Sequence, residues 1–221
     1  MERIGIVFDL DGTLLDTSCQ ISSALFRCFY MRGLPAPSKE NIFQFTGLPL
    51  PIMLQKFLVP EMLIKEITIE FRDYLSDLIE EGTPSFSGAV DLLEKLYSLN
   101  YCVGIATSKP TELAKKTLKF SELNNFPLLI QGTENFPPKP NPEILKKLSA
   151  QLYEAKIKVM IGDRKEDMET AMNFDITAVG VAQTSHTELE LREAGADLAF
   201  PNIAELLNSF EKFRDFITLA H

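Results

Sequence analysis

Short apolar runs, rich in β-branched residues, recur along this chain and alternate with amphipathic segments. The runs lie at 4–10, 101–106, 128–130, 157–161 and 176–181. Segments with apolar positions three and four residues apart separate most of them. This alternation is typical of parallel β-strands joined by right-handed crossover helices that cover both faces of one sheet. The pattern therefore predicts an α/β fold built on a doubly wound parallel sheet.

Capping signals mark where two of the helices should begin. Asn141-Pro142-Glu143 supplies an N-cap residue, a first-turn proline and an early acid before an apolar stripe. Asn202 is expected to cap the last helix. The apolar positions of that helix are Ile203, Leu206, Leu207 and Phe210.

One long segment, from about Ser18 to Glu81, breaks the alternation, because helical patterns follow one another there with no convincing strand. One of its helices carries apolar residues at three- and four-residue steps, which predicts a buried stripe. These residues are Ile64, Ile67, Phe71, Tyr74 and Leu78. The segment starts just after the first strand and returns near Gly82, so both of its linkers lie beside the end of that strand. This position predicts an insert that acts as a lid.

The most informative polar residues are two aspartates at the end of the first apolar run, in Phe8-Asp9-Leu10-Asp11-Gly12-Thr13. Alternate side chains of an extended strand share a face, so Asp9 and Asp11 can project towards one point. That point is at the carboxyl edge of the sheet, where open α/β sheets bind ligands. Two close carboxylates repel, which raises the pKa of one unless a cation or donor offsets them. The pair implies a metal or an acid/base pair, with an acidic turn as the simpler alternative.

Three later segments place further chemistry where strand patterns end. Thr107-Ser108-Lys109 can offer a hydroxyl and free backbone N–H groups to phosphoryl oxygens, or can simply cap a helix. Lys139 stands among prolines that restrict its backbone, and a positioned ammonium can neutralise charge on a transferred phosphoryl group. Asp163 and Asp167 could face one cation, or could mark a charged helix start.

These segments resemble, in the same order, the four motifs of the haloacid dehalogenase-like (HAD) phosphohydrolases. Asp9 and Asp11 lie in the first motif, Thr107 ends the second, Lys139 in Lys-Pro-Asn-Pro forms the third, and Gly162-Asp163 with Asp167 forms the fourth. Arg164 stands where relatives often carry Ser or Thr. The resemblance implies a Rossmann-like HAD core of residues 1–16 and 83–221 with an inserted helical cap, of the type called C1, at 17–82.

The resemblance also implies an activity, the hydrolysis of a phosphomonoester through an aspartyl-phosphate intermediate. Asp9 would be the nucleophile, and Asp11 the general acid and then the general base. Magnesium would be held by Asp9, the main-chain carbonyl of Asp11 and Asp163, with Asp167 as a ligand or a neighbouring support. The residues expected to contact the substrate are Gly47 in the cap and Thr107, Ser108, Lys109 and Lys139 in the core.

Within the phosphatases the chain looks most like the phosphoglycolate phosphatase group. A 5'-nucleotidase-like or a pyrophosphatase-like hydrolase is the alternative. A sugar phosphomutase would use the same core, and a non-catalytic phosphate-binding module is less consistent because every catalytic position is filled. Asp11 argues against a dehalogenase, since a halide leaving group needs no proton.

The composition of the chain limits the classes of partner that it is expected to bind. The chain has 221 residues and a formal net charge of -9, which disfavours a nucleic acid polymer or an anionic membrane and leaves a small phosphorylated metabolite. Cys19, Cys28 and Cys102 lack metal or disulfide spacing, and the amino terminus is too short for a signal peptide, so we expect a cytoplasmic protein. A monomer and a homodimer both remain open. His186 and His221 are not expected to be catalytic, and we expect His186 to face solvent.

Overall fold

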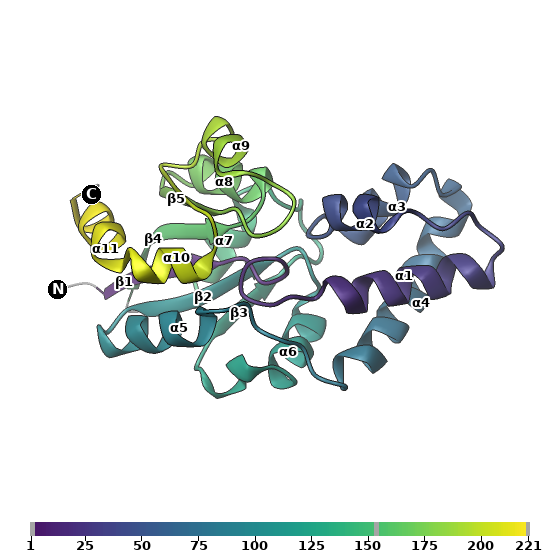
Figure 1. Cartoon of the computed structure of the whole chain (residues 1–221), viewed down its shortest axis with the longest axis horizontal. Helices are drawn as coiled ribbons and strands as arrows, with labels where there is room; N and C mark the ends of the chain where they lie inside the picture. The colour runs from purple at the N-terminus through teal and green to yellow at the C-terminus, as the bar shows by residue number, and fades with distance from the viewer. Residues whose placement is uncertain (1–2, 153–154, 220–221) are drawn as a thin grey trace.

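A computed structural model describes residues 3–152 and 155–219 of the chain (Figure 1). Its centre is a six-stranded sheet in the order β3-β2-β1-β4-β5-β6, in which all neighbouring strands are parallel. The strands are β1 (Arg3–Phe8), β2 (Cys102–Thr107), β3 (Leu129–Gly132), β4 (Ala155–Gly162), β5 (Thr177–Val181) and β6 (Leu198–Phe200). The predicted α/β class with a doubly wound parallel sheet is therefore confirmed.

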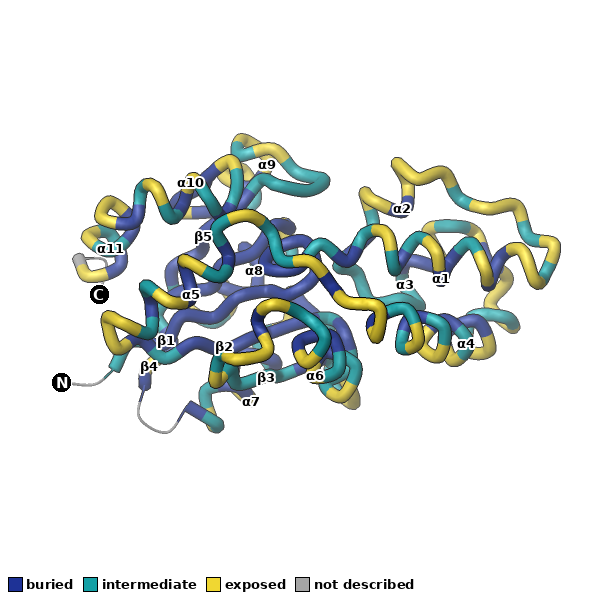
Figure 2. The backbone as a smooth tube through the Cα atoms, turned by 60° about the horizontal axis from the view of Figure 1, so that its bottom comes forward, coloured by how far each residue is buried: buried dark blue, intermediate teal, exposed yellow. Residues whose placement is uncertain are grey.

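Helices cover both faces of this sheet, as the alternation of apolar positions requires. Ile6 and Phe8 of β1 belong to one buried cluster, whereas Val7 belongs to the other. The first cluster includes residues of α5 (Ala89–Ser98), α6 (Thr111–Lys119), α10 (Ile203–Asn208) and α11 (Phe210–Leu219). The second includes residues of α7 (Glu143–Ser149), α8 (Lys165–Asn173) and α9 (Glu188–Glu193). Figure 2 shows the strands as the most deeply buried part of the chain.

The strand order determines where a ligand can bind. β1 lies between β2 and β4, and the order of the strands along the sheet reverses beside it. In doubly wound sheets the crevice for ligands opens at the carboxyl ends of the strands that flank such a reversal. Asp9 directly follows β1, Asp163 directly follows β4, and Thr107 ends β2. The predicted polar residues thus come from three adjacent strand ends.

The insert contains four helices and, among its described residues, no named strand. The helices are α1 (Ser18–Met31), α2 (Lys39–Phe45), α3 (Leu50–Lys56) and α4 (Glu61–Ile79). They form a hydrophobic cluster of their own, in which the predicted stripe of α4 contributes the buried Ile67 and Phe71. Figure 1 shows these helices together at one end of the molecule, beyond the carboxyl edge of the sheet. We call residues 17–82 the cap; its exact limits stay a prediction.

Two local expectations need correction, and one strand was not predicted. Asn202 does cap α10, because its Oδ1 accepts from the Glu205 N–H at 2.8 Å, but α10 is not the last helix and Phe210 begins α11. Asn141 Oδ1 accepts from the Glu143 N–H at 3.0 Å, but α7 starts one residue later than predicted, at Glu143. Strand β6 was not predicted, since three residues are too few to show a period.

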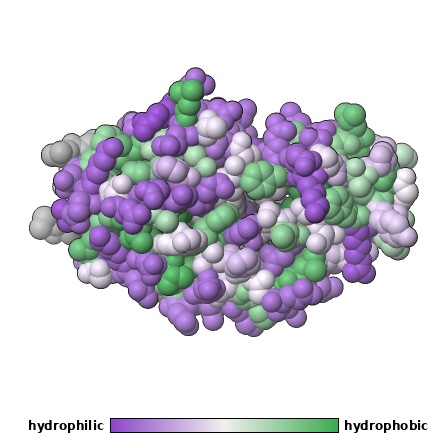
Figure 3. All heavy atoms as spheres, viewed as in Figure 1, coloured by the Kyte–Doolittle hydropathy of each residue, from purple (hydrophilic) through white to green (hydrophobic). Residues whose placement is uncertain are grey.

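The surface is mixed in character. Figure 3 shows hydrophilic residues over most of the visible face, with hydrophobic residues between them in small groups. Among the helices described here, none combines the length and the apolar character needed to cross a bilayer. A short 3₁₀ helix, η1 (Glu122–Asn125), completes the elements.

Candidate active site

The loop after β1 is held so that its two aspartates point to one place. The Asp9 N–H donates to the Ile161 carbonyl at 2.8 Å, which continues the pairing of β1 with β4 beyond the end of β1. Gly12 then adopts a φ of 89°, and a Cβ atom there would lie 2.7 Å from Asp163 Oδ2. The next residue, Thr13, donates through Oγ1 to Asp163 Oδ1 at 2.8 Å. Glycine is therefore required at position 12 both by the backbone angle and by the neighbouring carboxylate.

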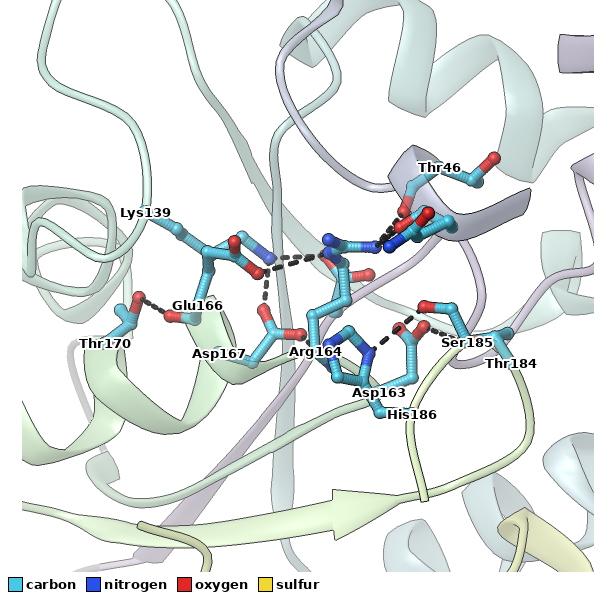
Figure 4. Close-up of polar contacts among 12 residues, drawn as sticks. Thr46, Lys139, Asp163, Arg164, Glu166, Asp167, Thr170, Thr184, Ser185 and His186 are labelled. Carbon is cyan, nitrogen blue, oxygen red and sulfur yellow. Dashed lines mark hydrogen bonds and ion pairs between the residues drawn. The ribbon is translucent and has the colours of Figure 1, made fainter. Parts of the chain in front are cut away.

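Three of the predicted acids meet in the interior. Asp9, Asp163 and Asp167 are all buried, and one carboxylate oxygen of each lies within 4.8 Å of the others. Lys139 joins them, since its Nζ lies 2.6 Å from Asp9 Oδ1. The same Nζ lies 2.5 Å from Asp167 Oδ1 (Figure 4). The Lys139 ammonium also donates to the Ala106 carbonyl at 3.2 Å, which anchors it to the end of β2.

The electrostatics of this cluster favour a further cation. Burial raises the pKa of Asp9 well above its usual value, and repulsion by Asp167 and Asp163 adds to this effect against the attraction of Lys139. Burial, followed by repulsion from Asp167, raises the pKa of Asp163 to about 6. Burial opposes the charge of Lys139, yet the carboxylates of Asp167 and Asp9 hold its pKa above the usual value. The Lys139 ammonium pairs with Asp9 and Asp167, and Asp163 adds a third carboxylate to the cluster, so the acids outnumber this ammonium.

The donor atoms fit magnesium. Mg²⁺ prefers hard oxygen ligands and is commonly bound through one or two carboxylates, with water and substrate phosphate completing its shell. Asp9 and Asp163 offer such oxygens at the site, and Asp167 offers a third. Asp167 is also engaged on both sides, because Oδ1 accepts from Lys139 and Oδ2 accepts from the Arg164 N–H at 3.1 Å. Asp167 thus ties the cluster to the start of α8.

The Asp11 side chain is not one of the three clustered acids and has a cation of its own. The Lys109 Nζ lies 2.7 Å from Asp11 Oδ1 and 3.2 Å from Thr117 Oγ1, and both charged side chains are buried. The sequence predicts that Lys109 contacts the substrate, and in the structure its ammonium forms an ion pair with the Asp11 carboxylate. The Lys109 N–H also donates to Thr107 Oγ1 at 3.2 Å, so the segment that ends β2 is ordered around the same residues.

A cavity opens beside Asp11, between the cap and the core. Its volume is about 250 Å³. Asp11, Ser108 and Lys109 line it from the core, and Gly47 with its neighbours lines it from the cap. Asp9 and Lys139 are also buried, at 3% and 7% exposure, but are not among the lining residues. The structure therefore places the predicted cap residue Gly47 opposite the end of β2.

Arg164 links the core to the cap, a role that the sequence did not reveal. Its Nη1 donates to the main-chain carbonyls of Gln44 at 3.0 Å and Thr46 at 2.7 Å, and its Nε contacts Glu166 Oε2 at 3.2 Å (Figure 4). A Cβ at Gly47 would lie 2.6 Å from Arg164 Cδ. The partners are about 120 residues away and are main-chain atoms, so no side-chain pattern could have identified them.

Two further residues around the cluster were not predicted. Thr184 donates to Asp163 Oδ2, on the side opposite Thr13. Gln183 donates to the Gly12 carbonyl at 3.2 Å and accepts from the Ile203 N–H at 3.1 Å, so it fixes the first loop against the start of α10. Thr and Gln after a strand are common, which is why the sequence alone gave no signal for them.

The expectation for His186 is wrong in part. The residue is half-buried rather than solvent-exposed, and its Nδ1 lies 3.1 Å from Ser185 Oγ (Figure 4). Burial, then the nearby positive charge of Arg164, lowers the pKa of its imidazole. His221 lies outside the described residues.

Comparison with known proteins points to one family. The family model described as "Haloacid dehalogenase-like hydrolase" matches residues 6–181. The "Probable phosphatase IndB" of Dickeya dadantii is 29% identical over 211 residues, covering 92% of each chain. The "Pyrophosphatase PpaX" of Bacillus cereus is 27% identical over 207 residues, covering 91% of this chain and 94% of its own. A solved haloacid dehalogenase-like hydrolase from Streptococcus pneumoniae superposes with a TM-score of 0.83 at 28% identity, covering 94% and 98% of the two chains.

Proposed function

The chain belongs to the haloacid dehalogenase-like hydrolase family, and on that premise we propose that it is a Mg²⁺-dependent phosphomonoesterase acting through an aspartyl phosphate. Family membership agrees with the resemblance of the four sequence motifs. One observation carries the proposal: the buried convergence of Asp9, Lys139, Asp163 and Asp167 beside Asp11. The substrate would be a small phosphorylated metabolite.

The metal site would use the oxygens nearest the end of β1. Asp9, Asp163 and the main-chain carbonyl of Asp11 would hold Mg²⁺, with Asp167 either joining them or supporting Lys139. When bound, the ion supplies positive charge close to the phosphoryl oxygens. The chain contributes by holding these ligands in place: Thr13 and Thr184 both donate to Asp163 and so fix its carboxylate.

Asp9 is the proposed nucleophile. Lys139 binds its Oδ1, which leaves Oδ2 to attack phosphorus. As the bond from Asp9 to phosphorus forms, the bond from phosphorus to the ester oxygen breaks, and the electron pair leaves with that oxygen. A protonated Asp11 gives its proton to the leaving oxygen.

The second step returns the enzyme to its starting state. Asp11, now a carboxylate, accepts a proton from water while the water oxygen attacks phosphorus. The bond from Asp9 to phosphorus breaks, and inorganic phosphate leaves. Lys109 keeps the Asp11 carboxyl group directed into the cavity during both steps, since the two side chains lie 2.7 Å apart.

The remaining predicted residues would bind the transferred group. Thr107, the Ser108 N–H and Lys139 would contact its equatorial oxygens, and Lys109 would add a second ammonium at the cavity wall. Phosphoryl transfer chiefly requires such positioning and positive charge. Gly47 would contact the substrate from the cap.

The direct test is release of inorganic phosphate from a panel of esters with Mg²⁺ and with a chelator. The panel includes phosphoglycolate, nucleoside 5'-monophosphates, sugar phosphates and pyrophosphate. We expect phosphate release that stops on chelation and returns when Mg²⁺ is restored. An isomeric sugar phosphate without free phosphate would instead mark a mutase. If no ester in the panel releases phosphate, a binding module is favoured and the proposal is contradicted.

The proposal also covers the cellular location, the partners and the oligomeric state of the enzyme. The net charge of -9 and the cysteine pattern support a cytoplasmic protein that binds no nucleic acid polymer and no membrane. The protein would act as a monomer or a homodimer. Size-exclusion chromatography with light scattering measures which of the two forms is present.

A further inference from the structure

The cavity beside Asp11 is the place that the leaving group would occupy. If Asp11 protonates the ester oxygen, the alcohol portion of the substrate must lie on the side of Asp11 that faces open space. Asp11 lines the cavity, whereas Asp9 and Lys139 are buried and are not among its lining residues. Ser108 and Lys109 are assigned to the phosphoryl group, so the chemistry of the remaining wall reports on the alcohol. This argument rests on the proposed phosphatase function.

The wall of this cavity is largely apolar. Side chains from α3 and α4 of the cap, including Leu50 and Phe71, face Leu113 and Phe136 of the core across it. Most of the other lining residues are also apolar, namely Ile21, Leu48, Pro49, Pro51, Met53, Leu75, Pro110 and Pro138. Binding energy in such a cavity comes from removing apolar surface of the ligand from water.

The charged residues of the wall leave no surplus positive charge for an anionic leaving group. Lys109 is already paired with Asp11 at 2.7 Å. The other two charged residues in the described lining, Arg72 and Glu134, are exposed and of opposite sign. A carboxylate or a second phosphate in the cavity would therefore be desolvated beside carbon atoms, where the only cation among the described lining residues besides the paired Lys109 is the exposed Arg72.

The volume of the cavity also favours a leaving group with a large carbon body. The cavity of about 250 Å³ is much larger than the roughly 30 Å³ that one water molecule occupies in the liquid. A two-carbon leaving group would fill a small part of this volume and leave much of the apolar wall in contact with water. A leaving group with a ring or a branched carbon body would displace that water.

From the apolar wall, the charges in it and the volume of the cavity, we propose that this enzyme selects phosphomonoesters of uncharged alcohols with a bulky apolar or aromatic body. Phosphoglycolate and pyrophosphate are then poor substrates, although both belong to substrate classes that the sequence left open. Residues of the cap and of the core determine the selectivity together, because both contribute to the wall.

The test compares kcat/KM for 2-phenylethyl phosphate, phosphoglycolate and pyrophosphate, with Mg²⁺ present. The first two are both phosphates of primary alcohols, so the comparison isolates the body of the alcohol. We expect 2-phenylethyl phosphate to be preferred at least tenfold over each of the others. If phosphate is released and phosphoglycolate or pyrophosphate is the preferred substrate, this inference is wrong, whereas the proposed function is not contradicted. No phosphate from any ester overturns both.

Variants that add a positive charge to the cavity wall provide a second test of the inference. Leu50→Arg adds a cation from the cap, and we expect it to reduce the preference for 2-phenylethyl phosphate over phosphoglycolate at least tenfold. Met62→Arg is the control, because Met62 is an exposed cap residue that does not line the cavity. Phe136→Arg adds a cation from the core side of the cavity. This variant replaces Leu50→Arg in the test if Leu50→Arg does not fold. An unchanged preference in a folded wall variant, or an equal change in the control, contradicts the inference.

Discussion

At the scale of single residues, the account depends on a buried excess of negative charge. Asp9 and Asp167 pair with the Lys139 ammonium, Asp163 lies in the same cluster, and all four groups are withdrawn from water. Such a set costs free energy of folding unless each charge has partners. The cluster is therefore tolerated for its chemistry rather than for stability, and removal of its parts should show this.

Removing the ammonium is the first prediction. Lys139→Met leaves two carboxylates without their shared cation, so we expect a loss of phosphate release together with a destabilisation of about 3–5 kcal/mol. Added Mg²⁺ should recover part of the stability but not the activity. Thermal and urea denaturation measure the first effect. Lys156→Met on the exposed side of β4 is the control and should change neither quantity appreciably.

The second prediction concerns pH. The pKa of Asp163 is raised in the folded chain from 3.8 to about 6, so between about pH 4 and pH 6 the folded state binds more protons than the unfolded state. The free energy of unfolding without metal should therefore fall as pH rises through this window. Mg²⁺ stabilises the ionised cluster, so its effect on the melting temperature should be larger at pH 7 than at pH 5. A larger effect at pH 5 would count against the metal site.

At the scale of elements, Arg164 joins the start of α8 to the end of α2 and to the residue that follows it. Its guanidinium donates to two carbonyls of the cap, and its side-chain stem lies against Gly47. The same short loop carries Asp163, so the position of the cap and the position of the proposed metal ligand depend on adjacent residues. This contact is the clearest physical link between the two parts of the molecule.

A double-mutant cycle tests that link. Gly47→Ala should destabilise the chain by about 1–2 kcal/mol, because φ is +96° and the new Cβ overlaps Arg164 Cδ. In an Arg164→Ala background the overlap is gone and only the backbone strain remains, so the cost should fall, with a coupling energy of about 0.5–2 kcal/mol.

Gly33 provides the matched control for this cycle. Gly33→Ala also has a positive φ, +62°, but its Cβ would meet no atom within 4 Å. Its cost should be the same with and without Arg164. Coupling at Gly33, or additivity at Gly47, would show that Arg164 does not hold the cap in the manner described. Urea denaturation of the four chains of each cycle gives the energies.

At the scale of the whole molecule, the sequence predicted the architecture well because the strongest signals were local. Apolar runs marked β1, β2, β3, β4 and β5, and the absence of such runs marked the helical insert. β6 was missed because Leu198–Phe200 is too short to show alternation. The boundary between α10 and α11 was missed because the apolar positions continue across it at helical spacing.

The site was predictable only where residues lie at strand ends. Asp9, Thr107 and Asp163 follow parallel strands, so their proximity follows from the fold class. The contacts of Arg164 with the cap carbonyls could not be predicted, since they depend on how α8 and α2 approach each other in space. The pairing of Lys109 with Asp11 likewise joins two loops that are far apart in the sequence.

The central claim, that one aspartate attacks phosphorus, is tested most directly by phosphate release from Asp9→Asn. The amide keeps the size of the side chain and removes the attacking oxygen, so kcat should fall by at least about three orders of magnitude. Circular dichroism should show an intact fold, and Asp73→Asn on the exposed side of the cap should leave the rate unchanged. Substantial phosphate release by a folded Asp9→Asn protein would contradict the account.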